Sequence, residues 1–149
     1  MYTKLFTITN LPLYYQHGNS ARKIMMNAIL SMQWHKRKSI HDTVQNVMEI
    51  KLASIPPIAV GKEDRFRISY GYYRDKSTGN VDIDGFAYLG KVINDSIAKK
   101  LGINDSIHRI IETRYCYLGQ RDKEELIVQV EKVDSIVVEK KKEVNDGME

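Results

Sequence analysis

The most constraining feature of the sequence is a change of periodicity between residues 65 and 101. Residues 65–73 alternate between apolar and polar side chains, which predicts a strand with one buried face. From residue 84 onward, apolar residues recur at 3-4-4-4 spacing, which predicts one buried stripe of a helix formed by Phe86, Leu89, Ile93, Ile97 and Leu101. We expect Asp84 to cap this helix and Gly102 to end it. A strand followed by a helix favours folds in which helices pack on a sheet.

The flanking segments supply further strands and helices. Alternation and β-forming residues predict strands over 2–9, 107–118 and 125–138, and apolar spacing predicts helices over 21–32 and 39–54. We expect Ser20 to cap the first helix after a loop over 13–20, and a turn over 119–124 to join the last two strands as a hairpin. The predicted fold class is α+β (mixed α/β), in a single domain with a mixed sheet of about four to five strands and two to three helices.

Length and composition are those of an ordinary soluble domain. The 149 residues suit one domain over 1–138, followed by a charged tail over 139–149. The formal charge of +4 permits a polyanionic partner without requiring one. The single cysteine, Cys116, excludes an intrachain disulfide and suits a reducing cytoplasm. No apolar run reaches the roughly 20 residues that cross a bilayer, so no membrane association is expected.

Two groups of residues are candidates for nucleic-acid contact. Lys36, Arg37 and Lys38 follow Trp34 and His35, and they are interpreted either as a phosphate-binding patch or as solvated charges that lead into a helix. Arg74 begins a polar loop over 74–80 and is a further candidate for DNA binding. The tyrosines of the strand over 65–73 could stack on bases, but packing in the core is the favoured interpretation.

The candidate catalytic residues lie around the start of the helix at residue 84. Side chains two residues apart in a strand point the same way, so Asp82 and Asp84 should lie close together. Two like-charged carboxylates are costly without a cation, and oxygen ligands suit magnesium. Asp105 could supply a third ligand, and Lys91 could neutralise a phosphate. The alternative is structural, because an aspartate in such positions often caps a helix or stabilises a turn.

The spacing of these residues resembles the core motif of RusA-like Holliday junction resolvases. The resemblance covers about residues 82–107 and consists of Asp82-x-Asp84, Lys91-x-x-x-Asp95-x-Ile97 and Gly102-x-Asn104-Asp105-x-Ile107. It implies a small homodimeric endonuclease, dependent on magnesium or manganese, that nicks both strands of a four-way DNA junction in a bacterial or phage-infected cell. Asp82, Asp84 and Asp105 match the metal-binding aspartates of that family, and Lys91 matches its catalytic lysine.

The sequence departs from the family pattern at three positions. Gly85 stands where asparagine is usual, Asn104 replaces the first aspartate of a pair, and Lys91 follows Asp84 by seven residues instead of four. On a continuous helix seven residues span about 10 Å, so we expect Gly90 to make 85–89 irregular and to loop out the extra residues. If the helix is regular instead, Tyr88 lies closer to Asp84 than Lys91 does. A DNA-binding protein that does not cleave and an unrelated interaction protein therefore remain open as alternatives.

Overall fold

The computed structural model describes residues 1–104 and 108–134. The predicted ligand Asp105, the end of the last predicted strand and the predicted tail lie outside these residues. The helices and strands, in chain order, are β1 Tyr2–Ile8, β2 Tyr14–His17, β3 Ser20–Lys23, α1 Met26–Leu30, α2 Trp34–Ala53, β4 Phe66–Arg74, the 3-10 turn η1 Ile83–Phe86, α3 Ala87–Leu101, β5 Ile110–Gln120 and β6 Glu125–Val133. The predicted α+β class with a mixed sheet is confirmed.

The main sheet has four strands in the order β1-β6-β4-β5. β6 runs antiparallel to both of its neighbours, whereas β5 runs parallel to β4. Because a parallel pair needs a crossover, the chain leaves β4, forms α3 and returns as β5. The predicted hairpin of the last two strands is wrong, because β4 lies between β5 and β6. The turn over 121–124 reverses the chain without pairing the strands on either side of it.

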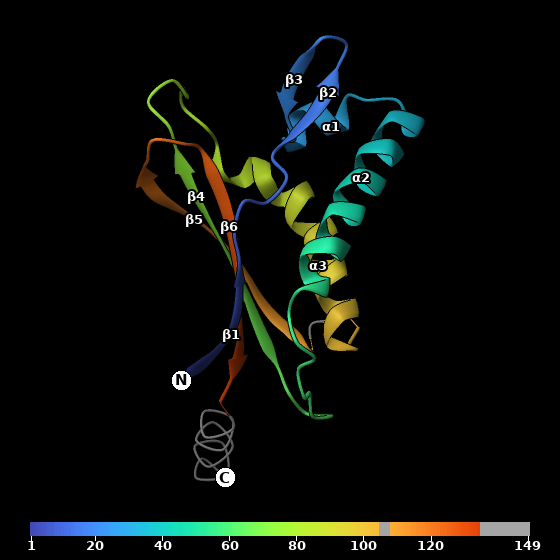
Figure 1. The fold of residues 1–149 in the computed structure, drawn as a ribbon, viewed down its shortest axis with the longest axis vertical. Helices are drawn as coiled ribbons and strands as arrows, with labels where there is room; N and C mark the ends of the chain where they lie inside the picture. The colour runs from blue at the N-terminus through green and yellow to red at the C-terminus, as the bar shows by residue number, and fades with distance from the viewer. Residues whose placement is uncertain (105–107, 135–149) are drawn as a thin grey trace, which may run out of the picture.

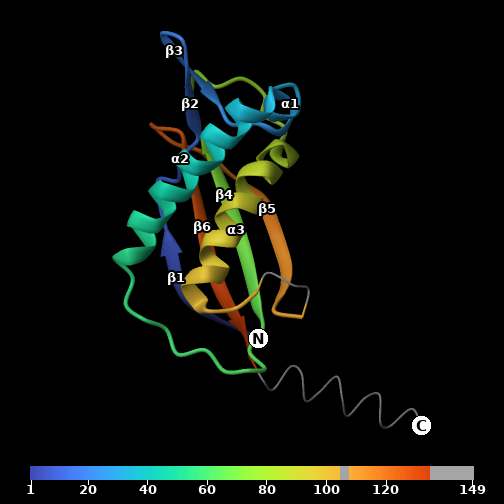
Figure 2. The ribbon, with the colours of Figure 1, turned by 90° about the vertical axis from the view of Figure 1, so that its right-hand side faces the viewer.

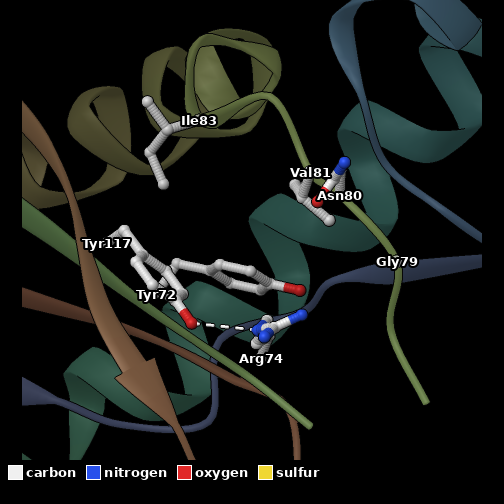
Figure 3. Close-up of a pocket in the computed structure, with 7 residues that line it drawn as sticks. All are labelled: Tyr72, Arg74, Gly79, Asn80, Val81, Ile83 and Tyr117. Atoms are coloured by element: carbon white, nitrogen blue, oxygen red, sulfur yellow. Dashed lines mark hydrogen bonds between the residues drawn. The ribbon is translucent and has the colours of Figure 1, made fainter. Parts of the chain in front are cut away.

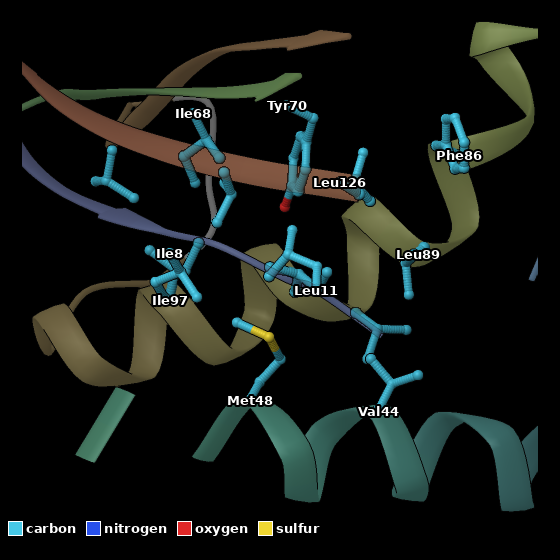
Figure 4. Packing of buried hydrophobic residues seen from close by; sticks show 14 of the residues in the cluster. Ile8, Leu11, Val44, Met48, Ile68, Tyr70, Phe86, Leu89, Ile97 and Leu126 are labelled. Atoms are coloured by element: carbon cyan, nitrogen blue, oxygen red, sulfur yellow. The ribbon is translucent and has the colours of Figure 1, made fainter. Parts of the chain in front are cut away.

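The helices cover one face of this sheet (Figure 1; Figure 2). The predicted stripe of α3 is confirmed, since all five of its residues are buried, and α2 contributes Ile40, Val44, Met48 and Leu52 to the same core (Figure 4). On β4, Tyr70 is 2% and Tyr72 is 1% exposed. These two tyrosines therefore belong to the core, as favoured above, and are not available to stack on bases.

The segment before α2 differs from the predicted loop and helix. β2 and β3 form a two-stranded antiparallel hairpin in which His17 pairs with Ser20. Gly18 has a φ of 60°, and a two-residue Gly-Asn turn of this kind matches the twist of paired strands. Ser20 is therefore a strand residue and not a helix cap, and only Met26–Leu30 of the predicted helix is helical.

α2 is longer than predicted and begins at Trp34, five residues ahead of the expected start. The basic stretch Lys36-Arg37-Lys38 is consequently part of the first two turns of the helix. No helix within the described residues has the length and apolar character needed to cross a membrane.

Candidate metal and DNA-binding site

The start of α3 carries the two predicted metal ligands. Asp82 precedes η1, and its Oδ1 accepts a hydrogen bond from the backbone N–H of Asp84 at 3.2 Å. The N-cap is therefore Asp82, not Asp84 as predicted, because the 3-10 turn begins before the α-helix does. Asp84 lies in the first turn of η1, and both aspartates are exposed to solvent.

These two carboxylates meet some of the requirements of a magnesium site but not all of them. Their oxygens are the ligand type that a hard cation prefers, but one oxygen of Asp82 is already bound by the Asp84 backbone. Among the described residues, no group of three His, Cys, Asp or Glu side chains comes together as a metal-binding cluster. The described residues thus provide two candidate ligands of the three that were predicted.

Gly85, where the resembling family usually has asparagine, packs closely against another element. A Cβ atom at this position would lie 2.2 Å from the terminal methyl of Met25. An asparagine would therefore force the Met25 side chain to move. Gly85 thus lies in close contact with the end of a flexible side chain from the segment before α1.

Gly90 lies inside the regular helix α3, and the irregular entry predicted over 85–89 is confined to residues 85–86, at the end of η1. Its backbone carbonyl accepts a hydrogen bond of 3.0 Å from the hydroxyl of Tyr70, and a Cβ at residue 90 would lie 2.1 Å from the hydroxyl oxygen of Tyr115. The Tyr70 and Tyr115 rings stack with centroids 5.2 Å apart. The glycine therefore allows two tyrosines of the sheet to approach α3, and no residues are looped out.

Lys91 consequently lies two helical turns beyond Asp84. It is exposed and borders a cavity of about 210 Å³ together with Asn94, Asp95, Thr113 and Tyr115, among others. Tyr88, one turn from Asp84, is half-buried, and its hydroxyl donates to the backbone carbonyl of Arg37 at 3.4 Å. The structure thus does not bring Lys91 to the two aspartates, and it uses Tyr88 to join α3 to the start of α2.

Arg74 borders a cavity of about 390 Å³ beside the loop that leads to Asp82 (Figure 3). Its Nε donates to the hydroxyl of Tyr117 at 3.0 Å, and residues 79–81 and Ile83 form the opposite wall. The cavity therefore places a fixed guanidinium next to the segment that carries the aspartates.

The three basic residues of α2 have different partners. Lys38 forms an ion pair of 2.9 Å with Asp42, one turn further along the helix. Lys36 Nζ instead lies 2.9 Å from Nδ1 of His17, on the β2–β3 hairpin. The sequence interpretation of these residues did not include His17.

A partly buried polar cluster that the sequence interpretation missed attaches the hairpin to the sheet. The carboxylate of Glu124 accepts hydrogen bonds from the hydroxyls of Tyr14 and Tyr72 and pairs with Lys23. Burial alone would raise the pKa of Glu124, but the hydrogen bonds from Lys23, Tyr14 and Tyr72 hold it below its ordinary value. The only signal in the sequence was the Gly18-Asn19 turn, because Tyr14 and Lys23 face each other only in a hairpin.

Part of the chain is similar to part of a curated protein. The chain is 31% identical over 80 residues to an NH(3)-dependent NAD(+) synthetase of Thermoplasma volcanium, a stretch that is 54% of this chain and 33% of the synthetase. The chain thus spans about a third of the length of the curated relative it matches. No protein-family model matches the sequence. A match of this extent does not assign NAD synthesis to the chain.

Proposed function

We propose that the chain is a magnesium-dependent endodeoxyribonuclease that resolves four-way DNA junctions by paired, symmetric nicks. The observation that carries the proposal is the exposure of Asp82 and Asp84 at the start of α3. Arg74 lies in the cavity beside the segment that leads to Asp82, and the Tyr88 hydroxyl joins α3 to the basic first turns of α2. The preference for junctions comes from the resemblance over residues 82–107.

The residues have separate roles in this proposal. Asp82 and Asp84, with Asp105, would hold Mg²⁺, or Mn²⁺ in its place. When bound, such an ion polarises the phosphodiester and lowers the pKa of the attacking water. Lys36, Arg37, Lys38 and Arg74 would contact the DNA backbone. Lys91, two turns from Asp84, would contact a flanking phosphate and not the scissile one.

Two further properties follow from paired cleavage and composition. Two symmetric nicks require two active sites, and a homodimer with a two-fold axis supplies them. The single cysteine, half-buried on β5, suits the cytoplasm of a bacterial or phage-infected cell.

The second candidate function is binding of branched DNA without cleavage, in replication or recombination. Two observations favour it. Asp82 already serves as a helix cap, and the regular helix keeps Lys91 away from the aspartates. Such a protein would keep the basic surface that binds DNA but would not cleave the phosphodiester bond.

The deciding experiment is a nicking assay on a four-way junction at fixed salt, with Mg²⁺ or Mn²⁺, for the wild type, Asp82→Asn and Asp84→Asn. We expect the wild type to nick the junction and both variants to bind it with little cleavage. The matched control is Asp64→Asn, because Asp64 lies before β4, at the opposite end of that strand from Arg74, and only stabilises a local turn. Junction binding by the wild type with no nicking in either metal would support the second candidate.

A further inference from the structure

The β2–β3 hairpin has two faces with different surroundings. In a hairpin, alternate residues and their cross-strand partners share a face, so Tyr14 and Lys23 lie on one side and Tyr15, His17 and Arg22 on the other. The first side is held by Glu124. The second side meets the start of α2, where Lys36 Nζ lies 2.9 Å from His17 Nδ1.

This second face gathers positive charge, and no carboxylate of residues 1–104 or 108–134 forms an ion pair with it. Arg22 is exposed, and no ion pair of Arg22 or Lys36 is formed within the described residues. Because an ammonium group only donates, Nδ1 of His17 must be the acceptor and the imidazole is neutral. Arg22 foremost, and then Lys36, lower the pKa of His17. The two cations therefore act on one imidazole from opposite elements.

The start of α2 adds to this unbalanced charge. Gln33 makes no side-chain cap, and no acidic residue lies in the first turn. Cations at a helix N-terminus oppose the helix dipole, whereas an anion there is stabilised by it. Lys36 and Arg37 thus occupy positions that are unfavourable until an anion is bound.

We propose that His17, Arg22 and Lys36 form a binding site for the phosphodiester backbone of DNA, so that the β2–β3 hairpin is a DNA-contacting element. The choice of DNA among polyanions rests on the proposed function. The site contacts phosphate and no base edge, so it should serve branched and linear DNA alike. Through the Tyr88 contact to Arg37, a strand held there would be positioned relative to the start of α3.

The test measures binding of a four-way junction and of a linear duplex by the full chain without divalent metal, between about 50 and 200 mM salt. The variants are Arg22→Gln and Lys36→Gln, with Arg22→Lys to retain the charge. Lys99→Gln is the matched control, because Lys99 is exposed in the last turn of α3. Thermal unfolding confirms that each variant is folded.

We expect each glutamine variant to weaken binding of both DNAs by roughly 5- to 10-fold near 0.1 M salt. Each should also reduce the slope of log K against log salt by about one, while Arg22→Lys and Lys99→Gln stay within about twofold of the wild type. By NMR, the pKa of His17 should rise when DNA binds, because the phosphate offsets the charges of Arg22 and Lys36.

The proposal would be overturned if both glutamine variants bound DNA with the affinity and the salt slope of the wild type. It would also be overturned if the protein bound anionic phosphatidylserine vesicles in place of DNA. Failure of the proposed nuclease is a separate result. It would appear as normal DNA binding by the wild type with no nicking when Mg²⁺ or Mn²⁺ is added.

Discussion

Lys23 Nζ lies 2.5 Å from Glu124 Oε2, and this ion pair joins the β2–β3 hairpin to the turn between β5 and β6. The Lys23 side chain is 18% exposed and that of Glu124 is 7% exposed. Lys23 also lies over the rings of Tyr14 and Tyr72, 5.8 and 5.6 Å from their centroids. A partly buried charged cluster therefore helps to fix the position of the hairpin, together with the buried side chains of Leu13 and Ile24 on either side of it.

Replacing Glu124 with glutamine should destabilise the fold. The change leaves the Lys23 ammonium in a little-exposed position without its counter-charge, and we expect a loss of roughly 2–4 kcal/mol in the free energy of unfolding. Urea denaturation measures it. The control is Asp42→Asn, which removes the exposed ion pair with Lys38 and should leave the midpoint unchanged. Equal midpoints for Glu124→Gln and the wild type would contradict a structural role for the cluster.

Stability should fall in acid partly because of Glu124. Its folded-state pKa lies below the ordinary value of 4.5, so the folded state binds the proton more weakly than the unfolded state does. The resulting stabilisation is complete above pH 4.5 and is lost as the pH falls through the folded-state pKa. The free energy of unfolding can be measured for the wild type and for Glu124→Gln between about pH 7 and pH 3. The difference between the two proteins should shrink as the pH falls. A constant difference over this range would contradict the linkage.

Gly90→Ala should destabilise the protein even though alanine favours a helix by about 1 kcal/mol. The new methyl would lie 2.1 Å from the hydroxyl oxygen of Tyr115, whose ring stacks on Tyr70. We expect a net loss of about 1–3 kcal/mol in the free energy of unfolding. With Tyr115→Leu already present, the same change should be neutral or stabilising, which a double-mutant cycle measures. If the effects of the two changes on the free energy of unfolding are additive, contact with Tyr115 is not the reason that residue 90 is glycine.

Lys91→Gln distinguishes a phosphate contact from a role in chemistry. Since Lys91 lies two turns from Asp84, we expect the junction KM to rise several-fold while kcat changes by less than about threefold. Steady-state kinetics give KM and kcat, and single-turnover nicking with saturating enzyme gives the rate constant of the cleavage step itself. A fall in kcat of about 100-fold, as for the loss of a group that stabilises the transition state, would place Lys91 at the scissile phosphate.

The elements with long, regular patterns were predictable from the sequence. The alternating aromatic row of β4 and the apolar stripe of α3 both have the burial that their periodicity indicates. These predictions succeed because periodicity reports which side of an element faces the core, and both elements contact the core along their length.

What the sequence did not reveal depends on contacts between distant residues. Gly90 was interpreted as a helix break, but its role is set by Tyr115, twenty-five positions further along the chain. The pairing of β5 and β6 was predicted from the turn between them, whereas their common neighbour is β4. At the candidate site, Asp82 and Asp84 are predicted to share one face of a strand, whereas Asp82 caps η1 and Asp84 lies within it. The position of Lys91 depends on the helix that follows.

The first and last described strands of the main sheet are neighbours, with Tyr2 opposite Val133. Pairing them closes a loop of almost the whole described chain, and closing long loops slows folding. β1 covers the outer edge of β6, so a chain that lacks β1 leaves β6 with an open edge able to pair with another chain. Expression of this protein should therefore tolerate changes at the β2–β3 turn better than any shortening of its first eight residues.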